Sequence, residues 1–95
     1  MSTSELLQLR DLFLAKLEGE QAKRKFKQPA DWISAERKVM VEYVNGERVR
    51  RGLPLIGLDL MVRLDNTCTG HDYSAKLALR CAELAMGIGS FQPAR

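Results

Sequence analysis

Residues 72–86 read DYSAKLALRCAELAM, a run that is almost entirely apolar. Leu77, Cys81 and Leu84 recur at intervals of four and three residues, which is the spacing of one face of an α-helix. A second row contains only small side chains, which let a neighbouring helix approach closely: Ala78, Ala82 and Ala85. The remaining polar strip is narrow: Lys76, Arg80 and Glu83. We therefore predict a helix over residues 72–87 that other elements cover on most sides.

The amino-terminal segment carries a second helical pattern. Its large apolar side chains recur at intervals of three and four: Leu6, Leu9, Phe13 and Leu17. Ser2 and Glu5 have the spacing of a capping box, in which each side chain accepts from a free amide of the first turn. We predict an amphipathic helix over residues 3–25. Pro29 disfavours a helical residue before it, so we place the break at 27–30.

The middle segment fits two structures. Asn45 and Gly46 favour the tight turn of a β-hairpin within residues 39–49. Such a turn would place Tyr43 opposite Arg48, and the second strand would offer little to a core. A helix over residues 31–51 instead groups the apolar side chains into two adjoining rows: Trp32, Val39 and Tyr43, and Ile33, Met40 and Val44. We favour the helix, with the hairpin as the alternative.

The segment from Gly52 to Gly57 is apolar and bounded by glycines, as expected for a buried loop. Gly52 can adopt the left-handed conformation that ends a helix, and Pro54 prevents the helix from resuming. Leu53, Leu55 and Ile56 could extend from this loop into an interface with another protein. Residues 58–64 favour a short helix, and residues 90–95 are predicted to form a flexible tail.

These elements predict an all-α fold, a small bundle of three longer helices and one short helix in a single domain of residues 1–95. The 45% of apolar and 28% of charged residues exclude an intrinsically disordered chain. A domain of this size buries about 60 to 65% of the surface of its unfolded chain, which leaves its stability marginal. A homo-oligomer is therefore possible.

Neither a membrane-spanning run nor a secretory leader is visible in the sequence. A span needs about 18 consecutive apolar residues, and no segment contains them. The first five residues, Met1 to Glu5, lack the cationic start of a signal peptide. We therefore predict a cytoplasmic protein without a membrane partner, in which Cys68 and Cys81 remain thiols.

One cluster contains residue types that can bind zinc or act as a nucleophile: Cys68, His71, Asp72 and Cys81. Structural zinc sites usually contain closely paired cysteines, and Cys81 lies in the apolar row of its helix. A catalytic Cys68 would need His71 within hydrogen-bond distance and a third group to orient it. We interpret His71 and Asp72 as the start of a helix, and predict no catalytic residue, metal, cofactor or small-molecule substrate.

Positive charge is concentrated in the middle of the chain. Residues 1–22 carry two basic and four acidic side chains (−2), residues 23–51 nine and four (+5), and residues 52–95 four and four (0). Two clusters supply most of this charge: Lys23, Arg24, Lys25 and Lys27 around Phe26, and Arg48, Arg50 and Arg51. Such clusters can neutralise phosphates while the aromatic ring stacks on a base. Basic residues at helix ends also simply complement the helix dipole.

The segment Gly70 to Tyr73, with the following Lys76 to Leu79 and Cys81 to Leu84, resembles short uncharacterised proteins of phages and prophages. This resemblance implies no activity. We predict a non-enzymatic accessory or regulatory protein that acts through protein–protein interaction or self-association. A nucleic-acid-binding regulator that uses the two basic clusters is the alternative, and an enzyme built on Cys68 and His71 is a third hypothesis.

Overall fold

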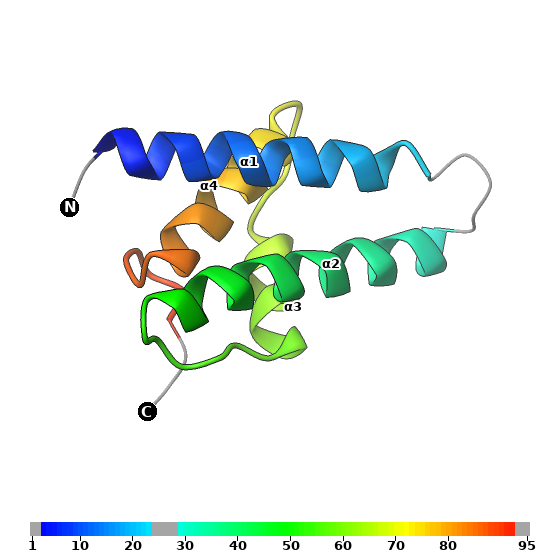
Figure 1. Ribbon diagram of the computed structural model, residues 1–95. Helices are drawn as coiled ribbons and strands as arrows, with labels where there is room; N and C mark the ends of the chain where they lie inside the picture. Colours follow the sequence, from blue (N-terminus) through cyan, green and yellow to red (C-terminus); the bar gives the residue numbers. More distant parts are fainter. Residues whose placement is uncertain (1–2, 24–28, 93–95) are drawn as a thin grey trace.

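The computed structural model describes residues 3–23 and 29–92, and this part of the chain contains four α-helices and no β-strand (Figure 1). The helices are α1 (Thr3–Gln21), α2 (Pro29–Arg50), α3 (Leu58–Asn66) and α4 (Tyr73–Ala85). The predicted all-α fold of three longer helices and one short helix is confirmed. None of the described helices is long and apolar enough to span a lipid bilayer.

The helices surround one apolar core. α1 and α2 run antiparallel, α4 packs mainly against α1, and α3 lies behind α2 (Figure 1). α4 is buried along both of its predicted apolar rows, through Leu77, Ala78, Cys81, Ala82, Leu84 and Ala85. The facing helices contribute Leu9, Phe13, Leu17, Met40, Val44, Met61 and Leu64. The predicted central position of the last helix is therefore correct.

The bounds of the first two helices differ from the predicted ones. α1 ends at Gln21, and the Lys23 amide then donates to the Glu20 carbonyl at 3.1 Å, which closes a tight turn before the predicted end. α2 begins at Pro29, whose fixed φ and missing amide suit the first position of a helix. Ser2 and residues 24–28 lie outside the described residues.

α2 continues through Asn45 and Gly46, so the hairpin alternative is wrong. The Asn45 side chain donates to the Ile56 carbonyl at 3.0 Å and accepts from the Ile56 amide at 2.8 Å. These two bonds hold the loop between α2 and α3 against the side of α2. Asn45 therefore serves a tertiary contact, which overrides its local preference for a turn.

Glycines with positive φ end both α2 and α4, and the sequence predicts the first of these caps, Gly52. Gly52 has a φ of 70° and Gly87 a φ of 76°. After Gly52, the Leu53 amide donates to the Arg48 carbonyl at 2.8 Å, and the Ile88 amide makes the equivalent bond at 2.9 Å. The two caps also meet, because a Cβ on Gly87 would lie 2.9 Å from the Leu53 side chain.

The remaining elements also differ from the predicted ones, and α4 spans Tyr73–Ala85 rather than residues 72–87. α3 extends to Asn66, beyond the predicted end at residue 64, and the Thr67 hydroxyl donates to the Leu64 carbonyl at 2.7 Å. The described part of the predicted flexible tail makes contacts with the rest of the fold. Phe91 packs against the core, and the Gln92 side chain accepts a hydrogen bond from Arg48.

Candidate functional site

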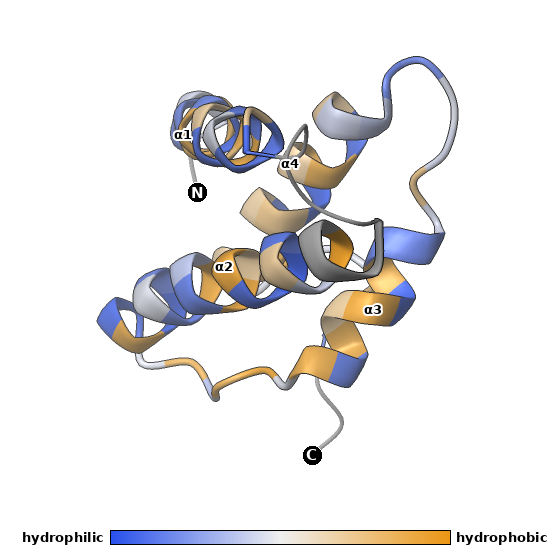
Figure 2. Cartoon of the chain, turned by 90° about the vertical axis from the view of Figure 1, so that its right-hand side faces the viewer, coloured by the Kyte–Doolittle hydropathy of each residue, from blue (hydrophilic) through white to orange (hydrophobic). Residues whose placement is uncertain are grey.

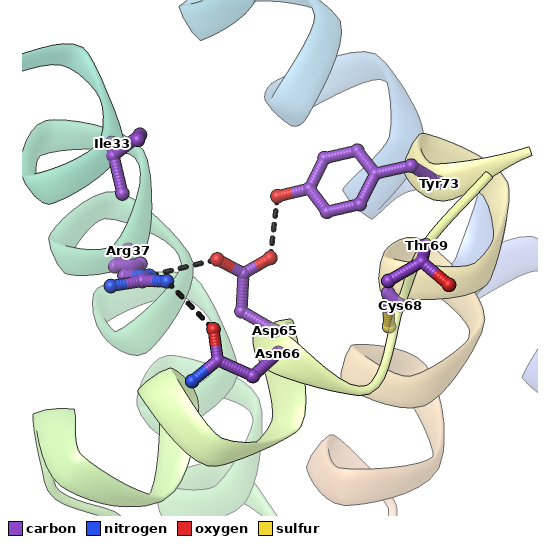
Figure 3. Close-up of a pocket in the computed structure, with 7 residues that line it drawn as sticks. All are labelled: Ile33, Arg37, Asp65, Asn66, Cys68, Thr69 and Tyr73. Carbon is purple, nitrogen blue, oxygen red and sulfur yellow. Dashed lines mark hydrogen bonds and ion pairs between the residues drawn. The ribbon is translucent and has the colours of Figure 1, made fainter. Parts of the chain in front are cut away.

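A pocket of about 360 Å³ opens between α2, α3 and the start of α4 (Figure 3). The buried carboxylate of Asp65 lies between Arg37 and Tyr73. Arg37 Nε donates to one oxygen of Asp65 at 2.8 Å, and the Tyr73 hydroxyl donates to the other. Arg37 also donates to Asn66 Oδ1 at 3.3 Å. Arg37, Asp65 and Tyr73 come from three different helices, α2, α3 and α4.

This arrangement joins three helices. Both oxygens of the Asp65 carboxylate already accept hydrogen bonds, and Arg37 compensates its charge. The rest of the pocket wall is formed by Ile33, Cys68 and Thr69. Hydrogen bonds from two other helices therefore hold the Asp65 carboxylate in place. We therefore interpret the Arg37–Asp65–Tyr73 network as a structural connection between α2, α3 and α4.

The cysteine and histidine cluster is not arranged as a nucleophilic site. Cys68 is buried, its thiol donates to the Leu64 carbonyl at 3.5 Å, and burial raises its pKa. A reactive cysteine requires the opposite shift and an accessible thiol. His71 is exposed in the turn before α4. Cys81 is fully buried, and burial raises its pKa strongly as well.

The described residues also offer no ligand set for a metal ion. The described residues contain no group of three or more histidine, cysteine, aspartate or glutamate side chains placed to hold one ion. The predicted position of Asp72 at the start of α4 is correct, although its carboxylate caps no amide. It pairs instead with Lys76 at 3.2 Å.

Arg48, predicted as a nucleic-acid contact, is instead a core residue and only 2% exposed. Its Nε donates to the Pro54 carbonyl at 2.6 Å. Its Nη1 donates to the Leu84 carbonyl at 2.6 Å and to Gln92 Oε1 at 3.0 Å. All three acceptors are neutral, and desolvation lowers the pKa of the guanidinium. Arg48 thus connects α2 to the following loop, to α4 and to the carboxyl-terminal segment.

The other described basic residues of the two clusters form ion pairs within the chain. Arg51 pairs with Glu47 at 2.7 Å and with Glu5 at 2.6 Å, and these carboxylates raise its pKa. Arg50 pairs with Glu47 at 3.0 Å. Lys23 pairs with Glu20 at 2.8 Å. Lys23 follows the end of α1 and Arg50 is the last residue of α2, at opposite ends of this antiparallel pair, so they do not form one continuous basic surface. Residues 24–27 lie outside the described residues.

The most open apolar surface lies on α2 and the loop that follows it. Val49 and Leu55 are each 62% exposed, and Tyr43 is 40% exposed. Among the described side chains of the two predicted apolar rows of α2, Met40 and Val44 face the core, whereas Tyr43 is exposed. We define the outer face of α2 as the exposed residues Glu42, Tyr43, Gly46, Val49 and Arg50.

The loop extends this surface. Asn45 and Val49 are four residues apart and lie on the same side of α2, so the loop that Asn45 binds runs past Val49. Figure 2 shows that this loop is largely hydrophobic. No family model, curated protein or solved structure matches this chain.

Proposed function

We propose that this protein is a non-enzymatic accessory or regulatory protein that acts by binding another protein chain through the outer face of α2 and the adjoining loop. The observation that carries this proposal is the exposure of Val49 and Leu55 on an ordered surface. Hydrogen bonds from Asn45 and Arg48 hold the loop backbone, so the exposed side chains are presented in a fixed position. A preformed apolar surface loses little conformational entropy on binding.

Two properties favour a binding role over catalysis. The Cys68 thiol is buried, and Arg37 and Tyr73 hold the Asp65 carboxylate as a link between helices. Both cysteines are free thiols, which agrees with the reducing conditions of the cytoplasm, where we place this role.

Site-specific photo-crosslinking tests the proposal. A photoreactive amino acid at Val49, introduced into the full chain in its native host, should form a discrete protein adduct on irradiation. The same group at Arg63, an exposed position on α3, serves as the matched control. Leu55→Glu should remove the Val49 adduct while the helical circular dichroism is unchanged. Equal labelling at both positions, or an adduct that persists in Leu55→Glu, would overturn the proposal.

The alternative role in nucleic-acid binding relies on the exposed Lys23 and on its neighbours Arg24, Lys25 and Lys27. Counterion release predicts a log–log salt slope of about −0.9 for each phosphate contacted on duplex DNA. A gel-shift series from low to physiological salt measures this slope. Absence of a shift at low salt would eliminate the alternative, whereas a shift that Lys23→Ala weakens would support it.

A further inference from the structure

The outer face of α2 has a symmetric sequence around Gly46. Glu42 and Arg50 lie four residues before and after this glycine, and Tyr43 and Val49 lie three residues before and after it. All five residues are exposed. In an α-helix, positions three and four residues away on either side share one face with the central residue. The face therefore has an acidic end, a basic end, and an apolar side chain on each side of its centre.

Gly46 contributes nothing to the isolated fold that would explain its presence. It lies inside a helix, where glycine is unfavourable, and a Cβ built on it would have no atom within 4 Å. Its φ is not positive, so an L-residue is compatible with the backbone. A glycine in the middle of an exposed helix face does allow the backbone of a second helix to approach closely.

On this basis, and resting on the proposed function, we propose that the partner is a second copy of this chain, bound by antiparallel crossing of the two α2 helices at Gly46. A two-fold axis through this point relates each residue before Gly46 to the residue equally far after it in the other copy. Glu42 of each copy then faces Arg50 of the other. Tyr43 of each copy packs against Val49 of the other.

The existing contacts of these side chains leave room for the dimer. Lys16 Nζ lies 5.2 Å from the centroid of the Tyr43 ring, and the Tyr43 side chain stays 40% exposed beside this contact. Among the described residues, Glu42 makes no ion pair, so its carboxylate is available. Arg50 is 74% exposed, and its pair with Glu47 is a surface pair of the kind that contributes little. If Arg50 turns to the second copy, Glu47 keeps its contact with Arg51 at 2.7 Å. Forming the intermolecular pairs therefore leaves no carboxylate without a partner.

Sedimentation equilibrium of the purified full chain tests this arrangement through charge reversal. The unmodified chain should show a monomer–dimer equilibrium. Glu42→Arg or Arg50→Glu alone should raise the dimer dissociation constant about tenfold or more, because the two-fold axis repeats each like-charge contact. The double variant restores both pairs and should return the constant to within about threefold of the original. Arg63→Glu, on α3, is the matched control and should have no effect.

Gly46→Gln distinguishes an effect on dimerisation from an effect on folding stability. The glutamine has room in the monomer and a better helix propensity, so urea unfolding should show a more stable chain. The same side chain blocks the crossing point, so this variant should remain monomeric.

Three results would overturn the proposed dimer: a monomeric unmodified chain at every concentration, a double variant no better than the single ones, or a dimeric Gly46→Gln variant. If a Val49 crosslink to a different protein nevertheless forms, the protein-binding function stands and only the identity of the partner is wrong.

Discussion

Arg48 is the residue whose role differs most from the one that its charge suggests. A buried guanidinium usually pairs with a carboxylate, but here all three acceptors are uncharged oxygens, from Pro54, Leu84 and Gln92. The bonds join segments that are far apart in the sequence. Because the fork of the guanidinium donates in several directions at once, one side chain can hold these segments together.

We expect Arg48→Met to lower the free energy of unfolding by about 3 kcal/mol, because it leaves buried carbonyls without donors. Arg48→Lys should also destabilise, by about 2 kcal/mol, since an ammonium cannot reproduce the forked geometry. Urea unfolding followed by circular dichroism measures both values. Arg63→Met, at an exposed position, should change stability by less than about 0.5 kcal/mol. Equal effects at the two positions would show that Arg48 does not have the structural role described.

The burial of Arg48 could be predicted from the sequence, but its partners could not. Arg48 lies four residues after Val44 and Arg37 lies three residues before Met40, so both arginines continue the core row of the helix. A cation in such a row requires buried acceptors. No periodic pattern identifies those acceptors, because Leu84 and Gln92 come from distant segments that only the tertiary fold brings together.

The two cysteines predict a loss of stability at alkaline pH. Burial raises both thiol pKa values above the reference value of 9.0, so the folded chain keeps its protons while the unfolded chain loses them. Their contribution is complete below pH 9.0 and declines as the pH rises above it, by up to about 1.4 kcal/mol per pH unit for each thiol.

Urea unfolding between about pH 8 and pH 10.5, under reducing conditions, measures this decline. Cys81→Ala should make the stability of the chain less dependent on pH above 9.0, although it also lowers stability at neutral pH by removing a core side chain. Parallel pH profiles for the two proteins would contradict the assignment of the alkaline loss to the thiols.

At the scale of the elements, Gly46 and Gly52 differ in backbone conformation, because only Gly52 has a positive φ. A Cβ added to either glycine would have no atom within 4 Å, so both positions have room for alanine. Gly52 has a φ of 70°, whereas Gly46 lies in the regular helix of α2. The pair therefore separates the cost of a left-handed residue from the cost of glycine in a helix.

Gly52→Ala should lower the free energy of unfolding by about 1 kcal/mol, because alanine is strained at positive φ. Gly46→Ala should raise it by up to about 1 kcal/mol through better helix propensity. Urea unfolding at a concentration where the chain is monomeric measures both values. Changes of the same sign would contradict the cap assigned to Gly52.

The helices themselves were largely predictable, because their periodicity reflects which side chains must be buried. The positions of the helix ends were less predictable. Gly52 and Gly87 were predictable caps, since few other residues adopt positive φ. The helical position of Asn45 was not predictable, because the same side-chain amide can favour a turn or bond to Ile56 in the tertiary fold. Tyr43 was grouped with the apolar rows, yet periodicity cannot tell a core-facing row from one that faces outward.

At the scale of the whole molecule, the network around Asp65 joins α2, α3 and α4 in a single cluster of side chains (Figure 3). The sequence did not predict this network, because its members are 28 and 8 residues apart and follow no common motif. Arg37 continues the core row of α2 and so lies away from the outer face of that helix. Changes in the network should therefore alter folding stability without altering the proposed interface.

A double-mutant cycle measures how strongly the network couples the helices. We expect Asp65→Asn to lower the free energy of unfolding by about 2 to 3 kcal/mol, since it leaves the partly buried Arg37 without its counter-charge. When Asp65→Asn is combined with Arg37→Met, the double variant should lose about 1 to 2 kcal/mol less than the sum of the two single losses, because both substitutions remove the same pair. The exposed pair Arg80–Glu83, at 2.9 Å, is the matched control, and its cycle should give a coupling below about 0.5 kcal/mol. Additive effects at Arg37 and Asp65 would mean that packing of the apolar core alone holds the three helices together.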